Sequence, residues 1–354
     1  MSITFKFLEA GVGDAILISS EGKNILIDGG DNYELLYNPL KSLKKSEEFI
    51  DLMILTHQDD DHIRGLLYLL KDENNRRLVK SIWFNSFEHD RIFNINSNNQ
   101  TSTADAMKFD DLATAIKEEN SNFTYKNSIY IEKYSNIKLF QDIDIDLLSP
   151  TESKLKTMED KYLKEKEEIL AKQNNSTASS SIDSSLTLEA LYSKSSPADT
   201  KPSNGSSIAF ILNYRSKYKF LLLADAHIST ILVSLRKMGF SKKNKLKVNF
   251  VKLSHHGSKY NFNLRFLNLI DTNTFIISTD GRGHNHPDVE VLSKIILDPI
   301  RKDKNGRIEK EIFFLFNYKK VCNKLKQQVA FNEESRKKFK FSLLHVDEYQ
   351  LTFE

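Results

Sequence analysis

Residues 51–62 read DLMILTHQDDDH, a dense apolar run that passes directly into a cluster of histidines and aspartates. The apolar part is typical of a short buried strand, and the side chains that follow are of the kinds that bind divalent cations. Alternate residues of an extended loop point the same way. We therefore expect His57, Asp59 and Asp61 to converge on one metal ion and His62 to face a second.

The same pattern of a strand followed by a polar cluster occurs three more times. Later apolar runs lead to Asp225, to the pair His255-His256 and to His286-Pro287. The histidines that follow predicted strand ends are His57, His62, His227, His255, His256, His284 and His286. Open sheets build sites where such strand ends meet, so we expect one metal centre. Asp225 is the candidate for a carboxylate that bridges two ions about 3.5–4 Å apart.

Composition excludes several classes of protein. The 354 residues are 40% hydrophobic and 28% charged, which excludes wholesale disorder. A net charge of +3 excludes a global polycation, and the single cysteine excludes a disulfide framework or a multi-cysteine metal site. The sequence contains neither an apolar run of the ~20 residues that a membrane span needs nor a basic leader before an apolar stretch. We expect a cytoplasmic protein without a membrane partner.

Hydrophobic patterning divides the chain into segments. Glycine turns separate three apolar runs at the start, which predicts an antiparallel meander. Residues 154–172 predict a charged helix, and the Ser-, Asn- and Thr-rich residues 174–207 predict a flexible insertion. Strand patterns resume between residues 208 and 278, and residues 303–354 are strand-like and basic.

These motifs resemble the metallo-β-lactamase superfamily, whose hallmark is His-x-His-x-Asp-His after a strand. Asp59 here replaces the second histidine. Together with Gly-Asp-Ala at 13–15, Leu-Ile-Asp-Gly-Gly at 26–30, His-His-Gly-Ser at 255–258 and His286-Pro287, this variant is similar to the ComEC branch, here as a stand-alone soluble form. ComEC is a DNA-uptake channel protein whose hydrolase domain is regarded as a nuclease. The resemblance covers about residues 1–290 apart from the insertion.

The resemblance implies a fold and a division into domains. The fold is α/β (α+β), a four-layer αβ/βα sandwich with an inserted Ser-rich segment. Residues 1–302 would form the hydrolase domain, with the charged helix and flexible insertion at 151–203. Residues 303–354 would form a strand-rich basic extension packed on the same domain.

The resemblance also implies a ligand set. His57 and Asp59 would bind one metal ion, Asp61 and His62 the other, and Asp225 would bridge them. One of His255 and His256 would complete the second position. His255 is our assignment as the ligand and His256 as a catalytic group, with the reverse left open.

Two positions depart from the family pattern. Ala224 stands where a glycine usually precedes the bridging aspartate, and the usual mid-chain histidine is missing from the stretch Ser-Asn-Gly-Ser-Ser at 203–207. Asn204 or Ser206 would orient substrate or water there. Fewer imidazoles favour oxygen-preferring ions, so the predicted cofactors are two divalent ions, zinc or manganese, with magnesium as a further option.

Catalytic roles follow from this arrangement. Two ions would lower the pKa of a bridging water to about 7, and Asp61 would orient that water or take its proton. His286 or His256 would protonate the leaving oxygen, although the turn at Pro287 could make His286 purely structural. Asp28 would hold a ligand imidazole, and Asp14 would lie at the rim.

The predicted substrate follows from local charge. Residues 226–270 contain no acidic side chain, and their nine lysines and arginines, Lys252 and Lys259 among them, surround the His255-His256 pair. Such a surface suits a phosphodiester backbone, although a lysine-rich helix end and loop would give the same pattern. The leading hypothesis is a nuclease or phosphodiesterase that cleaves DNA or RNA.

Two alternatives remain open. The same centre could hydrolyse a small molecule, such as a lactone, thioester or cyclic nucleotide. The chain could instead be a regulatory or partner-binding subunit, for example of a bacterial defence system, with a structural or vestigial metal site and a protein partner.

Overall fold

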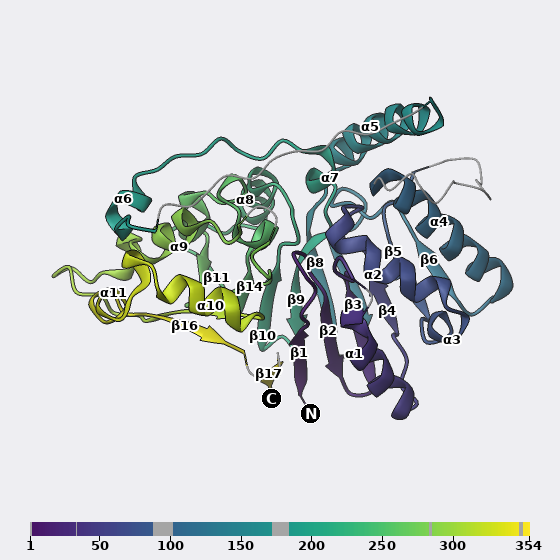
Figure 1. Cartoon of the computed structure of the whole chain (residues 1–354), viewed down its shortest axis with the longest axis horizontal. Helices are drawn as coiled ribbons and strands as arrows, with labels where there is room; N and C mark the ends of the chain where they lie inside the picture. Colours follow the sequence, from purple (N-terminus) through teal and green to yellow (C-terminus); the bar gives the residue numbers. More distant parts are fainter. Residues whose placement is uncertain (1, 33, 88–101, 172–183, 283–284, 347–349) are drawn as a thin grey trace.

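Two β-sheets lie face to face in the computed structural model (Figure 1). The structure describes residues 2–32, 34–87, 102–171, 184–282, 285–346 and 350–354. His284 therefore lies outside the described residues, as do residues 172–183 of the predicted insertion.

The first sheet contains the predicted antiparallel meander. Strands β1, β2 and β3 pair antiparallel, and β4, β5 and β6 continue the sheet in parallel. In spatial order the strands are β17 (Gln350–Phe353), β1 (Ile3–Phe7), β2 (Ile16–Ser20), β3 (Lys23–Ile27), β4 (Leu52–Ile54), β5 (Ser81–Trp83) and β6 (Thr124–Lys126).

The second sheet is mixed. Strands β7, β8, β9 and β10 pair antiparallel, and β10, β12, β14, β15 and β16 pair in parallel. In spatial order the strands are β16 (Phe341–His345), β15 (Ile312–Phe316), β14 (Thr274–Ile277), β12 (Phe250–Lys252), β10 (Tyr218–Leu222), β9 (Ala209–Tyr214), β8 (Ile143–Ser149) and β7 (Asn136–Phe140). A separate short pair consists of β11 (Leu246–Lys247) and β13 (Ile270–Asp271).

The inner faces of the two sheets share one apolar core. The ring of Phe5 lies 4.5 Å from that of Phe220 and 5.0 Å from that of Phe250, between ring centroids. Alternate residues of β1 point into this core because successive side chains of a strand face opposite sides.

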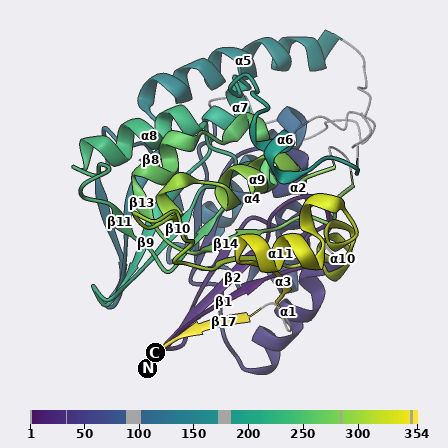
Figure 2. The ribbon, with the colours of Figure 1, turned by 90° about the vertical axis from the view of Figure 1, so that its left-hand side faces the viewer.

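Helices cover both outer faces. The first sheet packs against α1 (Glu34–Lys45), α2 (Asp60–Lys71) and α4 (Ser102–Glu119), and the second against α8 (Ile228–Lys237), α9 (Val289–Ile296) and α10 (Lys319–Lys326). Figure 2 shows these outer helices from the side. The layers are helix, sheet, sheet, helix, which confirms the predicted mixed α/β fold.

Shorter helices lie between the longer elements along the chain. They are α3 (Glu73–Arg76), α6 (Leu188–Tyr192), α7 (Pro202–Gly205), α11 (Glu333–Phe339) and the 3-10 helices η1 (Ser254–Gly257), η2 (Lys259–Asn261), η3 (Leu264–Asn268), η4 (Pro299–Arg301) and η5 (Val329–Phe331).

Residues 151–207 are partly helical and packed. The predicted charged helix is α5 (Glu152–Ala171). The prediction of flexibility is wrong for residues 188–192, because Leu188 and Leu191 of α6 are buried in the core cluster that contains α9. Two leucines one turn apart form an apolar stripe that the serine-rich composition hides.

The C-terminal segment completes both sheets. Strands β15 and β16 extend the second sheet, and β17 pairs with β1 at the edge of the first. The strand-like prediction for residues 303–354 missed α10 and α11, whose lysine-rich sequences carry few apolar residues. The domain boundary at residue 302 stays a prediction.

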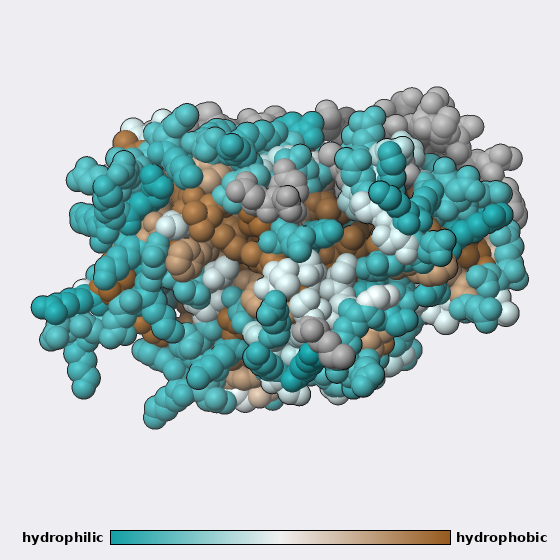
Figure 3. Space-filling model, turned by 90° about the horizontal axis from the view of Figure 1, so that it is seen from below, coloured by the Kyte–Doolittle hydropathy of each residue, from teal (hydrophilic) through white to brown (hydrophobic). Residues whose placement is uncertain are grey.

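An apolar band bordered by hydrophilic side chains crosses the face seen from below (Figure 3). Among the described helices, none has the length and apolar character that crossing a bilayer would require.

Candidate metal centre

The polar end of the opening motif lies at the start of helix α2. The helix begins at Asp60, with Asp59 as its N-cap residue. Asp61 and His62 therefore occupy the first helical turn. The prediction that His57, Asp59 and Asp61 converge by alternation in an extended loop is wrong for Asp61, because the helical turn rotates its side chain away from the other two.

His57 and Asp59 do lie together. His57 Nε2 is 3.6 Å from Asp59 Oδ2 and 3.7 Å from Asp225 Oδ2. His255 Nε2 also lies 3.7 Å from Asp225 Oδ2. We call this group the first position.

Asp61 and His62 face the other oxygen of the same aspartate. His62 Nε2 is 3.5 Å from Asp225 Oδ1 and 3.9 Å from Asp61 Oδ2. His256 Nε2 lies 3.3 Å from Asp61 Oδ2 and 3.9 Å from Asp225 Oδ1. We call these residues the second position, where His256 rather than His255 stands beside Asp61 and His62.

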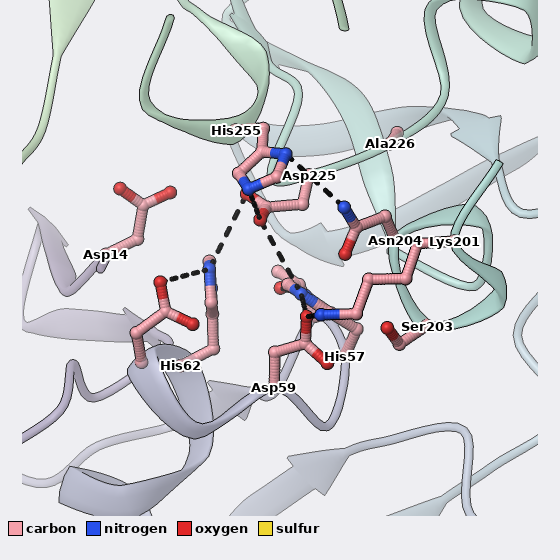
Figure 4. Close-up of polar contacts among 12 residues, drawn as sticks. Asp14, His57, Asp59, His62, Lys201, Ser203, Asn204, Asp225, Ala226 and His255 are labelled. Atoms are coloured by element: carbon pink, nitrogen blue, oxygen red, sulfur yellow. Dashed lines mark hydrogen bonds and ion pairs between the residues drawn. The ribbon is translucent and has the colours of Figure 1, made fainter. Parts of the chain in front are cut away.

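The topology of the second sheet brings these groups together. Strands β10 and β12 are parallel neighbours, so Asp225 and the His255-His256 pair emerge at the same sheet edge. Figure 4 shows Asp225 between His57, His62 and His255. The sites of open sheets form at such carboxyl ends.

Backbone geometry in this region is strained. Ala224, His255 and His256 have φ angles of 44°, 48° and 55°, in the left-handed region that favours glycine. Strained residues of this kind cluster at functional sites. Ala224 therefore adopts the turn for which the family pattern uses glycine.

A second layer of contacts orients the imidazoles. Asp28 Oδ2 lies 2.8 Å from His62 Nδ1 and also accepts a hydrogen bond from the Thr56 hydroxyl at 2.8 Å. His256 Nδ1 donates to the Ser278 carbonyl at 2.8 Å. Both contacts direct Nε2 toward Asp225, as expected for metal-ligating histidines.

The predicted rim residue Asp14 is buried. It forms an ion pair with Lys252, and its Oδ1 lies 3.5 Å from His256 Nδ1. Lys252 is only 1% exposed, so of the two roles expected for it, support of the centre or contact with substrate, its burial favours the first. Lys259 lies 3.5 Å from Asp288 and 3.8 Å from Glu290, which offset its charge.

The centre concentrates negative charge away from water. Burial raises the pKa of Asp225, but the imidazoles of His255, His62 and His256 hold it well below the usual range. Burial lowers the pKa of His256, and the carboxylates of Asp225 and Asp14 raise it to about 9. Burial also lowers the pKa of His62, but the carboxylates of Asp225, Asp28 and Asp61 raise it well above its usual value. The surroundings thus stabilise positive charge.

The stretch that lacks the family histidine has specific contacts. Asn204 Nδ2 lies 2.7 Å from Asp199 and 3.3 Å from His255 Nδ1. The Ser206 hydroxyl donates to the Ser203 carbonyl at 2.6 Å. Asn204 therefore reaches the centre through His255, whereas the hydroxyl of Ser206 is used within α7.

Sequence analysis missed Lys201. Its ammonium donates a hydrogen bond of 2.6 Å to Asp59 Oδ2 (Figure 4). Burial lowers the pKa of Lys201, but Asp59 raises it above its usual value. No sequence signal marks this lysine, because it is 142 residues from its partner.

His286 lies beside the centre. Its ring centroid is 5.3 Å from that of His255, and its Nδ1 is 3.5 Å from Asp288. Burial lowers its pKa, which Asp288 opposes.

The donor atoms fit a divalent ion at the second position. His62 Nε2, His256 Nε2 and Asp225 Oδ1 are buried and have no hydrogen-bond partner within the described part of the chain. Ligand atoms of Asp61, His62 and His256 lie within 4.8 Å of one another, as do those of His57, His62 and Asp225. Buried polar atoms normally have partners, and an ion bound by nitrogen and oxygen would supply one.

Comparison with known proteins agrees with this geometry. The sequence model described as Metallo-beta-lactamase superfamily matches residues 8–123, about a third of the chain, including the histidine–aspartate motif. This match supports the metallo-β-lactamase superfamily. Metallo-hydrolase is therefore the activity class that the comparison supports, whereas the ComEC branch stays a prediction. No curated protein sequence matches the chain.

Three solved structures align along the whole chain at low identity. Igni18, described as a novel metallo hydrolase from the hyperthermophilic archaeon Ignicoccus hospitalis, has 13% identity and a TM-score of 0.38, and the alignment covers 100% of this chain and 99% of that one. YhfI from Bacillus subtilis has 9% identity, a TM-score of 0.41 and coverages of 100% and 99%. A diphosphatase from the PhnP family has 11% identity, a TM-score of 0.40 and coverages of 100% and 98%. Because these scores are below 0.5, our fold assignment rests on strand order and the superfamily match.

Proposed function

We propose that this protein is a metal-dependent phosphodiesterase that acts on nucleic acid. The observation that carries the proposal is the convergence of imidazoles from two separate segments, 57–62 and 255–256, on the buried carboxylate of Asp225. Their hydrogen bonds to outer residues leave the Nε2 atoms of His62 and His256 directed toward one space. Such a preorganised set suits a divalent ion.

Asp61, His62, His256 and Asp225 are the residues that would hold this ion. A bound divalent ion supplies Lewis-acid chemistry and lowers the pKa of water. Asp61 is the only partly exposed member, with 25% of its side chain accessible. It is therefore placed to accept a proton from a water molecule that enters from solvent.

His286 is the candidate proton donor to the leaving oxygen. Its ring stands beside that of His255, and its Nδ1 atom lies 3.5 Å from Asp288. Asp28, Asp14 and Lys252 position the imidazoles and contact no substrate in this scheme.

Charge at the mouth of the centre supports an anionic substrate. The side chain of Lys201 is 52% exposed, although its ammonium also contacts Asp59. Anionic phosphate oxygens are suited to such a group. Lys252 is buried and Lys259 lies beside Asp288 and Glu290, so these two lysines do not contribute to a continuous basic track, and the proposed phosphodiester chemistry rests on the centre.

A cleavage assay tests this proposal. Purified protein with Mn²⁺ or Zn²⁺ would be incubated with labelled single- and double-stranded DNA and RNA. We expect metal-dependent cleavage that is lost in the Asp61→Ala His62→Ala variant. Asp60→Ala is the matched control, because Asp60 lies in the same helical turn but pairs with Arg64.

Failure to cleave any nucleic acid would overturn the nuclease proposal. Turnover of a cyclic nucleotide, lactone or thioester, lost in the same variant, would favour the small-molecule alternative. Bound metal without turnover of any of these substrates would favour the regulatory subunit, for which a protein partner would then be sought.

A further inference from the structure

Lys201 places a fixed positive charge inside the first position. We propose that its ammonium takes the place of one of the two cations, so that the centre binds one divalent ion per chain. This inference rests on the proposed function, since it presumes that the centre binds metal.

The first argument is that Lys201 already contacts an oxygen atom that would bind the ion at the first position. Asp59 Oδ2 is 3.6 Å from His57 Nε2 and 2.6 Å from Lys201 Nζ. The oxygen that would bind an ion at the first position is thus already in a short charge-assisted hydrogen bond. A divalent ion on the same oxygen would lie close to the ammonium, and the two cations would repel each other.

The second argument is that the lysine is held in place. The Lys201 backbone N–H donates to Asp199 Oδ1 at 2.8 Å, and its carbonyl accepts a bond of 3.0 Å from His227 Nε2. Lys154 Nζ lies 3.0 Å from His227 Nδ1. An ammonium can only donate, so Nδ1 is the acceptor and Nε2 carries the proton. Helix α5 therefore helps to position Lys201 through a neutral His227.

The third argument is the contrast between the two positions. Each position has two imidazoles, those of His57 and His255 at the first and those of His62 and His256 at the second. The carboxylates differ, because Asp59 Oδ2 contacts the ammonium of Lys201, whereas the ion-pair contacts of Asp61 among the described residues are with the imidazoles of His62 and His256. The chain thus supplies its own cation at the first position and leaves the carboxylate of the second for an ion.

The arrangement has a consequence for substrate choice. One N–H of the Lys201 ammonium donates to Asp59. Because the Lys201 side chain is half-exposed, its other N–H groups can donate to a substrate oxygen. A single ion beside a lysine would bind a phosphate ester more readily than a neutral lactone, because the ammonium neutralises charge on an anionic oxygen.

Metal stoichiometry tests this inference without reference to activity. Metal-free full-length protein would be dialysed against Mn²⁺, and bound metal would be measured by mass spectrometry. We expect one ion per chain for the wild type and two for Lys201→Met. Lys194→Met, whose side chain is similarly exposed and lies near Glu290, is the matched control and should bind one.

Electron paramagnetic resonance distinguishes a true pair of ions from a second, adventitious one. Lys201→Met should give a spin-coupled two-manganese signal that the wild type lacks, and Lys201→Gln should behave in the same way. Circular dichroism would confirm that both variants are folded.

Each other outcome is decisive. Two ions in the wild type would overturn the role of Lys201 and leave the proposed function standing. One ion in both Lys201→Met and Lys201→Gln would show that Lys201 does not prevent an ion from binding at the first position. No bound metal in the folded wild type would overturn the proposed function itself.

Discussion

Replacement of Lys252 by methionine tests whether the buried ion pair beside the centre stabilises the fold. Lys252 and Asp14 side chains are 1% and 3% exposed. Methionine keeps most of the side-chain volume, so the chief loss is the ammonium. Asp14 would then keep the imidazole of His256, at 3.5 Å, as its ion-pair partner among the described residues.

The expected magnitude follows from this burial. Removing one partner of a buried pair costs about 3–5 kcal/mol, because the remaining charge is uncompensated. Lys80 and Asp51 form an ion pair of 3.0 Å in which the lysine is 47% exposed. For Lys80→Met we expect a loss of about 0.2–1 kcal/mol, typical of exposed pairs.

Urea denaturation of the metal-free protein measures both losses. A second variant, Lys252→Met Asp14→Asn, removes the stranded charge and should recover part of the stability, because a buried neutral amide without a partner costs about 1–3 kcal/mol. If Lys252→Met lost less than about 1 kcal/mol, or if the double variant were less stable than the single one, the account of this ion pair would be wrong.

Four further changes test the centre and its supports. Asp28→Asn should weaken metal binding by about 10–100-fold in a chelator competition, because the carboxylate orients His62. Ala224→Gly should stabilise the fold by roughly 0.5–1 kcal/mol in urea, since relief of about 1–2 kcal/mol at φ 44° exceeds the cost of glycine in the unfolded chain. Gly13→Ala should destabilise by about 1–3 kcal/mol or more, because a Cβ would meet the Asp61 carbonyl at 1.6 Å. Chelation should lower the free energy of unfolding by about 2.7 kcal/mol relative to protein in metal at 100 times Kd.

The contrary results are equally specific. Unchanged metal affinity in Asp28→Asn would show that the imidazole needs no carboxylate to orient it. A less stable Ala224→Gly variant would mean that the turn is unstrained, and a fully stable Gly13→Ala variant would mean that the chain relaxes easily there. An identical melting curve with and without chelator would exclude a resident ion.

Sequence patterns predicted strands of the fold, and the resemblance implied its layers. The first of the apolar runs between glycine turns predicted β1, and the dense apolar run before His57 predicted β4, because buried strands have apolar sequences. The helices near the C-terminus were missed, since their lysine-rich sequences carry few apolar residues.

The position of Asp61 shows the limit of local reasoning. Its identity was visible in the motif, but its direction depends on whether the chain there is extended or helical. The structure begins α2 at Asp60, which turns Asp61 toward His256 and away from His57.

The chain itself determined which residue types follow each strand, and parallel pairing of β10 with β12 then brings Asp225 to the histidines. Tertiary structure alone decided that His256 stands beside Asp61, that Lys252 is buried and that Lys201 reaches Asp59. Such contacts join residues far apart along the chain, and their geometry depends on how the two sheets and the intervening helices pack. Local sequence carries no record of that packing.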